Sequence, residues 1–562
     1  MAVEQKKRLG DLLIDAGKLS ENNLLAALEQ QKKLGKKLGE VLIELGVLSE
    51  EEIIDAIVQQ TGIQAVELGD VDFDRKVLKL VPEQLCQKYG LIPFGFNGNK
   101  IQVAMADPLN IYALDDLAIS TGFAIETFIS PKSLIQRYIQ VHYSTEQVFQ
   151  AAEALAEENR LTKNQVTPVN TESFEDVKNS PIVKMIDYLF KNAVEMRASD
   201  IHIEPFETKV RIRYRIDGVL QLMNELQLES LAALVTRIKI MANLNIAEKR
   251  APQDGRIITK VNQQEIDLRV SILPVVYGEK IVIRILNRNN LKMDKSQLGL
   301  SPQNLAKLTQ LLASPHGVIL VTGPTGSGKS TTLYTLLSEM NDNQTNIVTI
   351  EDPVEFMVEG INQVNVNPKA NVTFVSGLRS ILRQDPDVVM IGEIRDEETA
   401  QIAIRAAITG HLVLSTLHTN DAPSTIIRLQ DMGIAPYLLT SSISGIIAQR
   451  LVRQNCPYCL TAHEATAREK QILQLPAEQT IQLYSGTGCG RCNNIGYYGR
   501  IGVYEILALD ETLRQAVASQ ATPDQLRHLA MQNGMTTLAQ ECRQLVLSGQ
   551  TTVDELLTIV LT

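Results

Sequence analysis

Short apolar runs separated by helical patterns dominate the second half of the chain. The runs GVILVTG, NIVTIE, DVVMIGEI and HLVLSTLH lie between residues 317 and 418. Strands that are apolar throughout are buried on both faces, and helical stretches between them are typical of parallel sheets. From about Leu300 the pattern therefore predicts an α/β domain with a buried, largely parallel sheet. After Leu451 the chain becomes rich in cysteine and then ends in helical segments.

A different pattern precedes this domain. Residues 181–198 have the periodicity of an amphipathic helix, and several strand-like runs follow, among them DIHIEP, KVRIRYRIDGVL and EKIVIRIL. This order of elements predicts an α+β region. Residues 144–179 are rich in Glu, Ala, Asn and Thr and show little periodicity, which predicts a linker.

The N-terminal segment repeats one pattern twice. Seven pairs of identical or similar residues, the first being Leu9 and Leu38, are each 29 positions apart. In each copy a short helical pattern ends at a glycine, and the dipeptide LS then begins a second helix. The pattern predicts a duplicated helix–turn–helix unit, followed by a mixed pattern from about Val71 to Tyr143.

Composition and charge limit the classes of protein to which this chain can belong. The 562 residues are 44% hydrophobic and 21% charged, which suits three or four globular domains of roughly 100–200 residues each. A net charge of −11 argues against a protein that coats nucleic acid. The start has no apolar signal core, and no apolar run reaches about 18 residues. We therefore expect a cytoplasmic protein without direct membrane insertion.

The segment GPTGSGKST is the most specific chemical signal in the chain. It fits the P-loop pattern, follows an apolar run and precedes a helical pattern, which argues against a glycine-rich turn without a ligand. Its backbone N–H groups and lysine would hold phosphates, and its first serine after the lysine would offer a hydroxyl to Mg²⁺. Ser330 is thus the predicted Mg²⁺ ligand. The residues predicted to bind ATP are Gly323, Pro324, Thr325, Gly326, Ser327, Gly328, Lys329, Ser330 and Thr331.

Three apolar runs end in polar residues that we expect beside this loop. Glu351 closes NIVTIE, Glu393 follows DVVMIG, and His418 closes HLVLSTLH. A carboxylate at such a strand end can orient Mg²⁺ and water or polarise the attacking water. Asp387 lies at the other end of its strand, so Glu393 is the better candidate beside the metal. Which of Glu351 and Glu393 is the main base stays open, and His418 is either structural or a γ-phosphate sensor.

Four cysteines form two C-x-x-C pairs, Cys456 with Cys459 and Cys489 with Cys492. Two such pairs can close a tetrahedral site of four sulfurs suited to Zn²⁺. Because no ligand position stays open, this zinc would be structural. Free thiols or a redox pair are the alternatives, and six cysteines in so long a chain do not suggest a disulfide scaffold.

Arginines alternate with apolar residues along one predicted strand. Arg211, Arg213 and Arg215 would all point to one face of that strand. The simple interpretation is a solvated sheet face, and the alternative is that one or two reach a nucleotide held by the next domain. Arg269 and Arg284 are further candidates on neighbouring strands.

Together these motifs resemble the GspE/PilB family of secretion ATPases. The matching segments, ASDIHIEP, RIRYRIDG, GPTGSGKSTTLY, TIEDPVE, LRQDPDVVMIGEIRD, LSTLHTND and the four cysteines, occur in the family's order over nearly the whole chain. The resemblance implies an α/β multidomain protein with a RecA-like P-loop ATPase core. The implied parts are an N-terminal repeat domain that is mainly helical (1–145), a linker (146–179), an α+β, PAS-like domain (180–295), and the ATPase domain with its tetracysteine zinc subdomain and C-terminal helices (300–562).

The resemblance also implies a function and partners. It suggests a cytoplasmic homohexamer, peripheral to the inner membrane, that hydrolyses ATP and acts on an inner-membrane platform protein and a cytoplasmic assembly ring. The family's motifs place Glu351, Glu393 and His418 at the nucleotide, completed by Arg213 or Arg215 and by Arg269. The cysteines and the long N-terminal region resemble assembly ATPases, which favours type IV pilus assembly. Type II secretion is the alternative.

The doubled N-terminal pattern resembles a domain that binds cyclic di-GMP in some relatives. Gly10 and Gly39 would give backbone freedom beside a cation in each copy, and Lys37 replaces the arginine of the first copy. Lysine cannot make the bidentate, stacked contacts of arginine, so the second copy would bind more weakly. The alternative is a structural repeat. The residues matching the motif are Arg8, Leu9, Gly10, Leu13, Gly17, Leu24, Leu28, Gln31, Leu38, Gly39, Leu42, Gly46, Ile53, Ile57 and Gln60.

Two other functions fit a P-loop protein. A DNA translocase is disfavoured by the acidic balance of the chain and by the pilus-type motifs. A nucleotide-gated scaffold with little turnover is disfavoured by the presence of Glu351 and Glu393.

Overall fold

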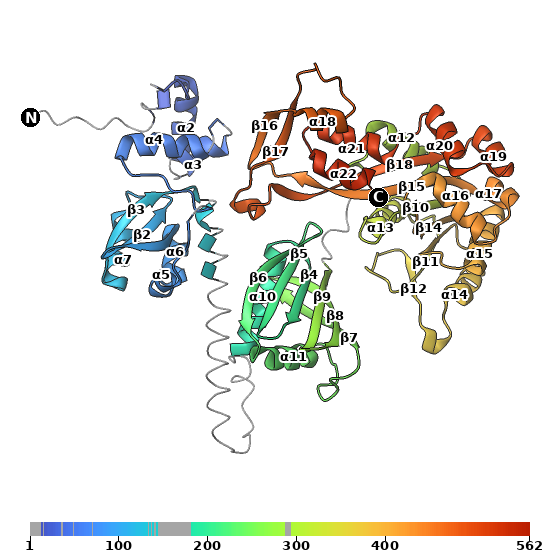
Figure 1. Ribbon diagram of the computed structural model, residues 1–562, viewed down its shortest axis with the longest axis horizontal. Helices are drawn as coiled ribbons and strands as arrows, with labels where there is room; N and C mark the ends of the chain where they lie inside the picture. The colour runs from blue at the N-terminus through green and yellow to red at the C-terminus, as the bar shows by residue number, and fades with distance from the viewer. Residues whose placement is uncertain are drawn as a thin grey trace, which may run out of the picture.

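The computed structural model describes residues 10–69, 71–143, 181–286 and 294–561, except 11–12, 15, 35–37, 46, 49, 133, 137 and 140–141. Arg8, Leu9, Lys37, Gly46 and the predicted linker 146–179 lie outside the described residues. Figure 1 follows the chain from N-terminal helices (blue) through a six-stranded sheet (green) to a seven-stranded sheet that carries the C-terminal helices (yellow to red).

The N-terminal helices form the doubled helix–turn–helix unit that the sequence predicts. Gly10, Leu13 and Ile14 are helical, and Gly17 ends this first helix in a left-handed conformation with φ 70°. Ser20 then accepts the N–H of Asn23 at 3.3 Å, which begins the next helix. The helices that follow are α2 (Glu21–Leu34), α3 (Leu38–Glu44) and α4 (Glu50–Thr61).

A small mixed sheet follows these helices. Its strand order is β1-β2-β3, with β1 and β2 antiparallel and β2 and β3 parallel. Its core is apolar and includes the buried thiol of Cys86. The elements are α5 (Arg75–Leu80), α6 (Glu83–Tyr89), β1 (Leu91–Asn97), β2 (Lys100–Met105), α7 (Ile111–Thr121) and β3 (Ala124–Ile129).

The second region is α+β, as predicted. Its six strands have the order β6-β5-β4-β9-β8-β7, and every neighbouring pair is antiparallel. Along β5 every second residue is buried, and these buried residues share one core with α10 and α11. The elements are α10 (Pro181–Glu195), β4 (Ala198–Pro205), β5 (Lys209–Ile216), β6 (Val219–Gln227), α11 (Ser230–Met241), β7 (Gln253–Val261), β8 (Gln264–Val275) and β9 (Gly278–Leu286).

The third region contains the predicted parallel sheet. Its order is β12-β11-β13-β14-β10-β15-β18, and only β18 runs antiparallel to its neighbour. Strand β10 is buried throughout, which explains its uninterrupted apolar sequence. The strands are β10 (Gly317–Thr322), β11 (Ile347–Glu351), β12 (Asn362–Asn365), β13 (Val388–Ile391), β14 (Leu412–Leu417), β15 (Ile443–Asn455) and β18 (Tyr497–Ala508).

Helices cover both faces of this sheet. Ile319 and Val321 of β10 pack with α12 and α13, whereas Val318 and Leu320 belong to the larger core shared with α14–α17 and the C-terminal helices. None of the helices in the described part of the chain is long and apolar enough to cross a bilayer. The elements are η2 (Lys295–Leu298), α12 (Pro302–Leu312), α13 (Lys329–Met340), η3 (Pro368–Ala370), α14 (Phe374–Ile381), α15 (Glu397–Ile408), α16 (Ala422–Asp431), α17 (Pro436–Ser442), α19 (Glu511–Ala518), α20 (Pro523–Gln532), α21 (Leu538–Leu547) and α22 (Val553–Val560).

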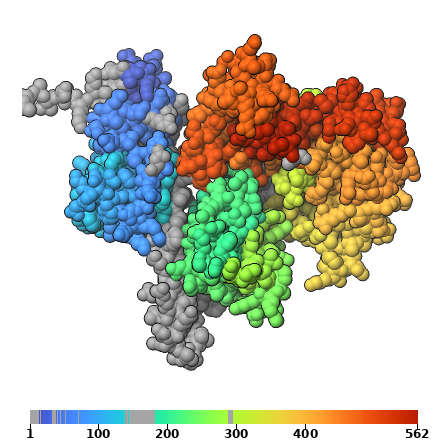
Figure 2. Space-filling view, in the orientation of Figure 1, coloured from blue at the N-terminus to red at the C-terminus, as the bar shows by residue number. Residues whose placement is uncertain are grey.

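A small cysteine module is inserted between β15 and β18. It consists of β16 (Leu460–Glu464), α18 (Ala467–Ile472), β17 (Gln482–Gly486) and η4 (Gly490–Cys492). At the start of β18, which follows the module, Gly499 donates its N–H to Asp217 of the six-stranded domain at 2.9 Å, and Arg197 stacks 3.6 Å from the ring centre of Tyr498. Figure 2 shows the module's orange surface beside the green six-stranded domain. The start of β18, beside the module, therefore joins the second and third regions.

Candidate functional site

The P-loop, residues 323–328, connects β10 to α13. Gly323 and Gly328 have φ of 149° and 87°, and a Cβ on Gly323 would lie 2.4 Å from the carbonyl oxygen of Gln449. Strand β15, which carries Gln449, therefore passes so close behind the loop that glycine is required. Ser330 and Thr331 begin α13 and are exposed, so the Ser330 hydroxyl is free to face a ligand at the loop.

Lys329 stands at the first position of α13 and folds back over the loop. Its Nζ donates to the carbonyl oxygens of Gly323 at 2.8 Å and Pro324 at 3.0 Å. Burial lowers the pKa of Lys329 to about 8; the charge of Glu393 opposes this shift, and the charge of Arg450 adds to it. The lysine is thus held beside the loop in a poorly hydrated position, where a phosphate would stabilise its charged form.

The carboxyl ends of neighbouring strands bring the predicted polar residues to one edge of the sheet. Glu351 ends β11, Glu393 follows β13, and His418 follows β14, which pairs with the P-loop strand β10. Asp387 lies at the opposite end of β13, where its carboxylate accepts the N–H of Asn346 at 2.7 Å. Parallel strands deliver their ends to one edge, so the prediction of a shared edge follows from the topology.

Glu351 is a buried acid with three side-chain donors. Its side chain accepts hydrogen bonds from Tyr334, from Thr349 at 2.6 Å and from Gln363 at 3.2 Å. Only 4% of the residue is exposed. These donors occupy both carboxylate oxygens, so Glu351 holds α13, β11 and β12 together.

Glu393 is more open and lies beside an arginine and a histidine. Its Oε2 is 3.6 Å from Nε2 of His418, and its Oε1 accepts a hydrogen bond from Arg395 at 2.5 Å. Burial by itself would raise the pKa of Glu393, but Arg395 and the nearby His418 outweigh it and hold this pKa below its usual range. Glu393 is therefore ionised at neutral pH, and its charge also acts on Lys329.

The predicted arginines divide into two groups. Arg213 donates to Glu204 at 2.7 and 3.0 Å, and Arg215 lies 3.6 Å from Asp200, so both pair with acids of their own sheet. Arg269 instead reaches the third region. It donates to the carbonyl oxygen of Val354 at 3.1 Å and pairs with Glu355 at 2.8 Å. The structure thus brings Arg269, and not Arg213 or Arg215, to the loop after β11.

A cavity of about 1380 Å³ lies between the six-stranded sheet and the segment after β11. Arg256, Arg269 and Arg284 lie opposite one another on β7, β8 and β9 and line its wall. Arg256 was not among the predicted arginines; strand alternation in QDGRIITKV was the signal that could have found it. Arg450 was not predicted either, although its position inside the apolar run IIAQRLV indicates a charge in a buried strand.

The four cysteine sulfurs of the module converge. All lie within 4.8 Å of one another, and three pairs are 3.7–3.8 Å apart. A tetrahedral site with Zn–S bonds of about 2.3 Å has sulfur–sulfur edges of about 3.8 Å. The N–H groups of Cys489 and Gly496 also point at the Cys492 sulfur, at 3.1 and 3.3 Å, as expected for a thiolate. The residues present therefore fit a structural zinc ion.

The doubled N-terminal motif builds a shared core. Leu13, Leu42 and Ile53 are buried in it, and Leu24, Leu38 and Ile57 pack against it. Leu28, Gln31 and Gln60 are half-buried.

The expectation of backbone freedom at the first glycine of each copy is wrong. Gly10 and Gly39 lie inside helices, where an added Cβ would meet Leu24 at 3.0 Å and Ile53 at 3.1 Å. Both glycines instead allow helices to approach each other closely. The two contacts are equivalent, because Leu24 and Ile53 are separated by 29 positions, as Gly10 and Gly39 are.

Comparisons with known proteins agree with this architecture. The chain matches the family model described as type II/IV secretion system protein over residues 175–558, and the MshEN domain model over residues 61–148. It is 41% identical to the type IV pilus assembly ATPase PilB of Myxococcus xanthus, over 98% of each chain. It is 50% identical to the type II secretion system ATPase E of Vibrio cholerae, over 63% of this chain and 70% of that one.

A solved structure extends the likeness to the fold. The X-ray structure of the Legionella pneumophila ATPase DotB is 22% identical and superposes with a TM-score of 0.51, covering 67% of this chain and 95% of its own. The seven-stranded sheet with its P-loop is accordingly a RecA-like core. The matched family model spans more than half of the chain and includes all residues of the site described above. The chain belongs to the GspE/PilB family of type II/IV secretion ATPases.

Proposed function

We propose that this protein hydrolyses ATP to ADP and phosphate and uses the energy to drive type IV pilus assembly. The observation that carries the proposal is the meeting of Lys329, Glu393 and His418 at one edge of the seven-stranded sheet. A loop that binds phosphate beside an ionised acid and a histidine is the arrangement required for phosphoryl transfer to water.

Each residue of the site has a separate role in hydrolysis. Backbone N–H groups of the P-loop and Nζ of Lys329 hold the phosphates, and the start of α13 adds partial positive charge. The Glu393 carboxylate orients the attacking water and accepts its proton. His418, 3.6 Å from Glu393, donates to the γ-phosphate oxygen or the departing phosphate. Glu351 supports the acidic loop from its buried position, so Glu393 is the main base of the two.

A divalent cation fits this site. The exposed Ser330 hydroxyl is a hard oxygen donor of the kind that Mg²⁺ prefers, and the phosphate oxygens of the nucleotide would supply others. When bound, Mg²⁺ supplies charge that offsets the negative phosphates. Arg269, which already reaches the segment after β11, completes the nucleotide site from the second domain.

We also propose that the working unit is a ring of six copies at the cytoplasmic face of the inner membrane, acting on a platform protein and a cytoplasmic assembly ring. The similarity to the pilus assembly ATPase of Myxococcus xanthus supports the proposed role in pilus assembly, because the alignment covers 98% of both chains. Type II secretion is the second candidate, supported by the 50% identity to the Vibrio cholerae secretion ATPase.

For the N-terminal part we propose cyclic di-GMP as a ligand. The match to the MshEN domain supports this proposal, although that match covers residues 61–148 and begins after the doubled motif. The motif leucines are used in packing, so the contacts that bind the ligand would come from the polar positions of the motif, led by Arg8. For the cysteine module we propose one structural Zn²⁺ per chain.

The test compares the full-length wild type with Lys329→Ala in steady-state ATP hydrolysis and in complementation of a deletion strain. We expect turnover to fall by roughly 100-fold or more, and pili to be lost, because the phosphates lose their nearest cation. Lys369→Ala, an exposed lysine on η3, is the matched control. A Lys329→Ala protein with wild-type turnover would overturn the ATPase proposal. A deletion strain with normal pili and defective protein secretion would favour type II secretion instead.

A further inference from the structure

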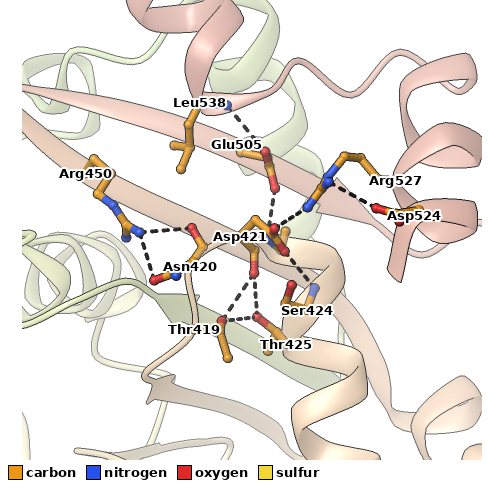
Figure 3. Close-up of polar contacts among 11 residues, drawn as sticks. Thr419, Asn420, Asp421, Ser424, Thr425, Arg450, Glu505, Asp524, Arg527 and Leu538 are labelled. Atoms are coloured by element: carbon orange, nitrogen blue, oxygen red, sulfur yellow. Dashed lines mark hydrogen bonds and ion pairs between the residues drawn. The ribbon is translucent and has the colours of Figure 1, made fainter. Parts of the chain in front are cut away.

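The segment that follows His418 is held by several distant elements, beginning with Thr419. The Thr419 N–H donates to the hydroxyl of Thr322 at 3.0 Å, and Thr322 is the last residue before the P-loop. The Thr419 hydroxyl also meets that of Thr425 on α16 at 2.6 Å. Thr419 therefore connects the histidine strand to both the P-loop strand and α16. Figure 3 shows its contact with Thr425 of α16.

Asn420 is held by a buried arginine. Nη2 of Arg450 donates to both the carbonyl oxygen and the side-chain oxygen of Asn420, each at 3.2 Å. Arg450 lies on β15, only 9% of it is exposed, and its charge lowers the pKa of Lys329. Asn420 and the P-loop lysine thus share one cationic neighbour.

Asp421 connects the same segment to α20. One oxygen accepts the N–H of Ser424 at 2.8 Å and so caps the start of α16. The other accepts a hydrogen bond from Arg527 at 2.5 Å. Figure 3 shows Arg527 reaching from α20 toward Asp421, with the exposed Asp524 on its far side.

Glu505 joins two helix starts with one carboxylate. It lies on β18, is 2% exposed, and accepts the N–H of Ala422 at 2.8 Å and that of Leu538 at 3.3 Å. These are the first residues of α16 and α21. The first N–H groups of a helix have no partner within the helix and carry partial positive charge. A buried carboxylate that satisfies two of them ties the segment after His418 to the C-terminal helices.

His418 itself depends on this scaffold. Its side chain is 52% exposed, and among the described residues its ion-pair partner is Glu393 at 3.6 Å. The imidazole is not enclosed by packing, so its position follows from the backbone on either side of it.

We propose that Glu505 and Arg527 are positioning residues for ATP hydrolysis, which hold residues 419–421 so that His418 faces Glu393, and through which the C-terminal helices α20 and α21 influence turnover. The inference rests on the ATPase function proposed above. It assigns a role to two residues that lie outside the P-loop and its strand ends. Movement of α20 or α21 would displace His418 and leave the P-loop in place.

The experiment measures kcat and KM for ATP in the full-length protein. Glu505→Gln preserves shape but replaces one acceptor oxygen with an NH₂ group that faces an N–H. We expect kcat to fall roughly tenfold, because small displacements of a reacting group have large kinetic effects. We expect KM to change less than about twofold, since Lys329 and the P-loop stay in place. Arg527→Gln, on a partly exposed side chain, should act in the same direction without a risk to folding.

The matched control is Asp524→Asn. Asp524 contacts the same arginine at 3.4 Å but is 91% exposed and does not touch the segment after His418. The kcat of the Asp524→Asn protein should equal that of the wild type.

A double-mutant cycle with His418→Ala separates positioning from general stability. If Glu505 acts through His418, Glu505→Gln should cause no further loss of kcat in the His418→Ala background. Equal losses in both backgrounds would overturn the inference, as would Glu505→Gln and Arg527→Gln proteins with wild-type kcat. An inactive wild type would overturn the proposed function and this inference with it, whereas unchanged variants beside an active wild type would overturn the inference alone.

Discussion

At the scale of single residues, burial changes what a side chain can do. Lys329 is a P-loop lysine by its sequence, and its surroundings lower its pKa to about 8 because burial disfavours the charged amine. Glu393 keeps its charge because Arg395 and His418 lie beside it. An ionised acid and a lysine that loses its proton more easily than usual therefore share one site before nucleotide binds.

The lowered pKa of Lys329 makes nucleotide binding depend on pH. Below about pH 8 the amine is charged; above it the amine is neutral, and a bound phosphate must draw a proton to it. We expect affinity for ADP to fall about tenfold between pH 7 and pH 9. Calorimetry at pH 8.5, in buffers with different ionisation enthalpies, should show net proton uptake.

The control for this prediction is Lys329→Arg, whose guanidinium stays charged throughout. Proton uptake should be absent in that variant. Wild-type binding that takes up no proton at pH 8.5 would show that the amine is already fully charged in the free protein.

At the scale of elements, the close approach of two helices or strands explains residues that take no part in the reaction. Gly323 lets β15 pass behind the P-loop, and Gly10 and Gly39 let helices of the doubled unit touch. Glu505 lets two helices begin at the same carboxylate. In each case the neighbour that matters lies on another element.

The cysteine module is an element that should depend on metal. We expect elemental analysis to give about one Zn per chain, because three sulfur pairs already have the edge length of a tetrahedral site. Cys489→Ser should lose zinc and lower the melting temperature of the protein. The control is Cys86→Ser, because Cys86 lies in a separate core; this variant should retain the zinc of the cysteine module. A zinc-free protein that remains folded and active would contradict a structural role.

At the scale of the whole molecule, the relation between the domains depends on a few polar contacts. Arg269 bridges from the six-stranded sheet to Glu355, and Asp217 accepts the N–H of Gly499 beside the cysteine module. These contacts place the arginine wall of the cavity opposite the segment after β11. Arg269 thereby links the second domain to the segment after β11.

The N-terminal part provides a test of regulation at this scale. We expect calorimetry on the full chain to detect cyclic di-GMP at micromolar concentration, with Arg8→Ala weakening binding more than Lys37→Ala. Arginine makes bidentate contacts with phosphate that lysine cannot make. Lys76→Ala, an exposed lysine outside the doubled unit, is the control. No binding at micromolar ligand would leave the doubled motif as a packing device.

Much of this architecture follows from local patterns in the sequence. Apolar runs predicted the parallel sheet, a helical pattern followed by strand-like runs predicted the α+β region, and the 29-residue spacing predicted the doubled helical unit. The placement of Glu351, Glu393 and His418 at one sheet edge was also predictable, because parallel strands deliver their ends together. These features depend on residues that are close in sequence or on the rule for one kind of sheet.

Other features were decided only by the tertiary structure. Glu351 is buried by Tyr334 and Gln363, Arg213 pairs with Glu204, and Glu505 lies more than 80 positions from Ala422. Periodicity reveals which face of a strand or helix is apolar, but not which distant side chain will neutralise a charge or occupy a hydrogen bond. By itself the sequence determined the elements and the chemical groups of the site. The fold determined their partners, their burial and hence their pKa, since those depend on contacts between residues far apart in the chain.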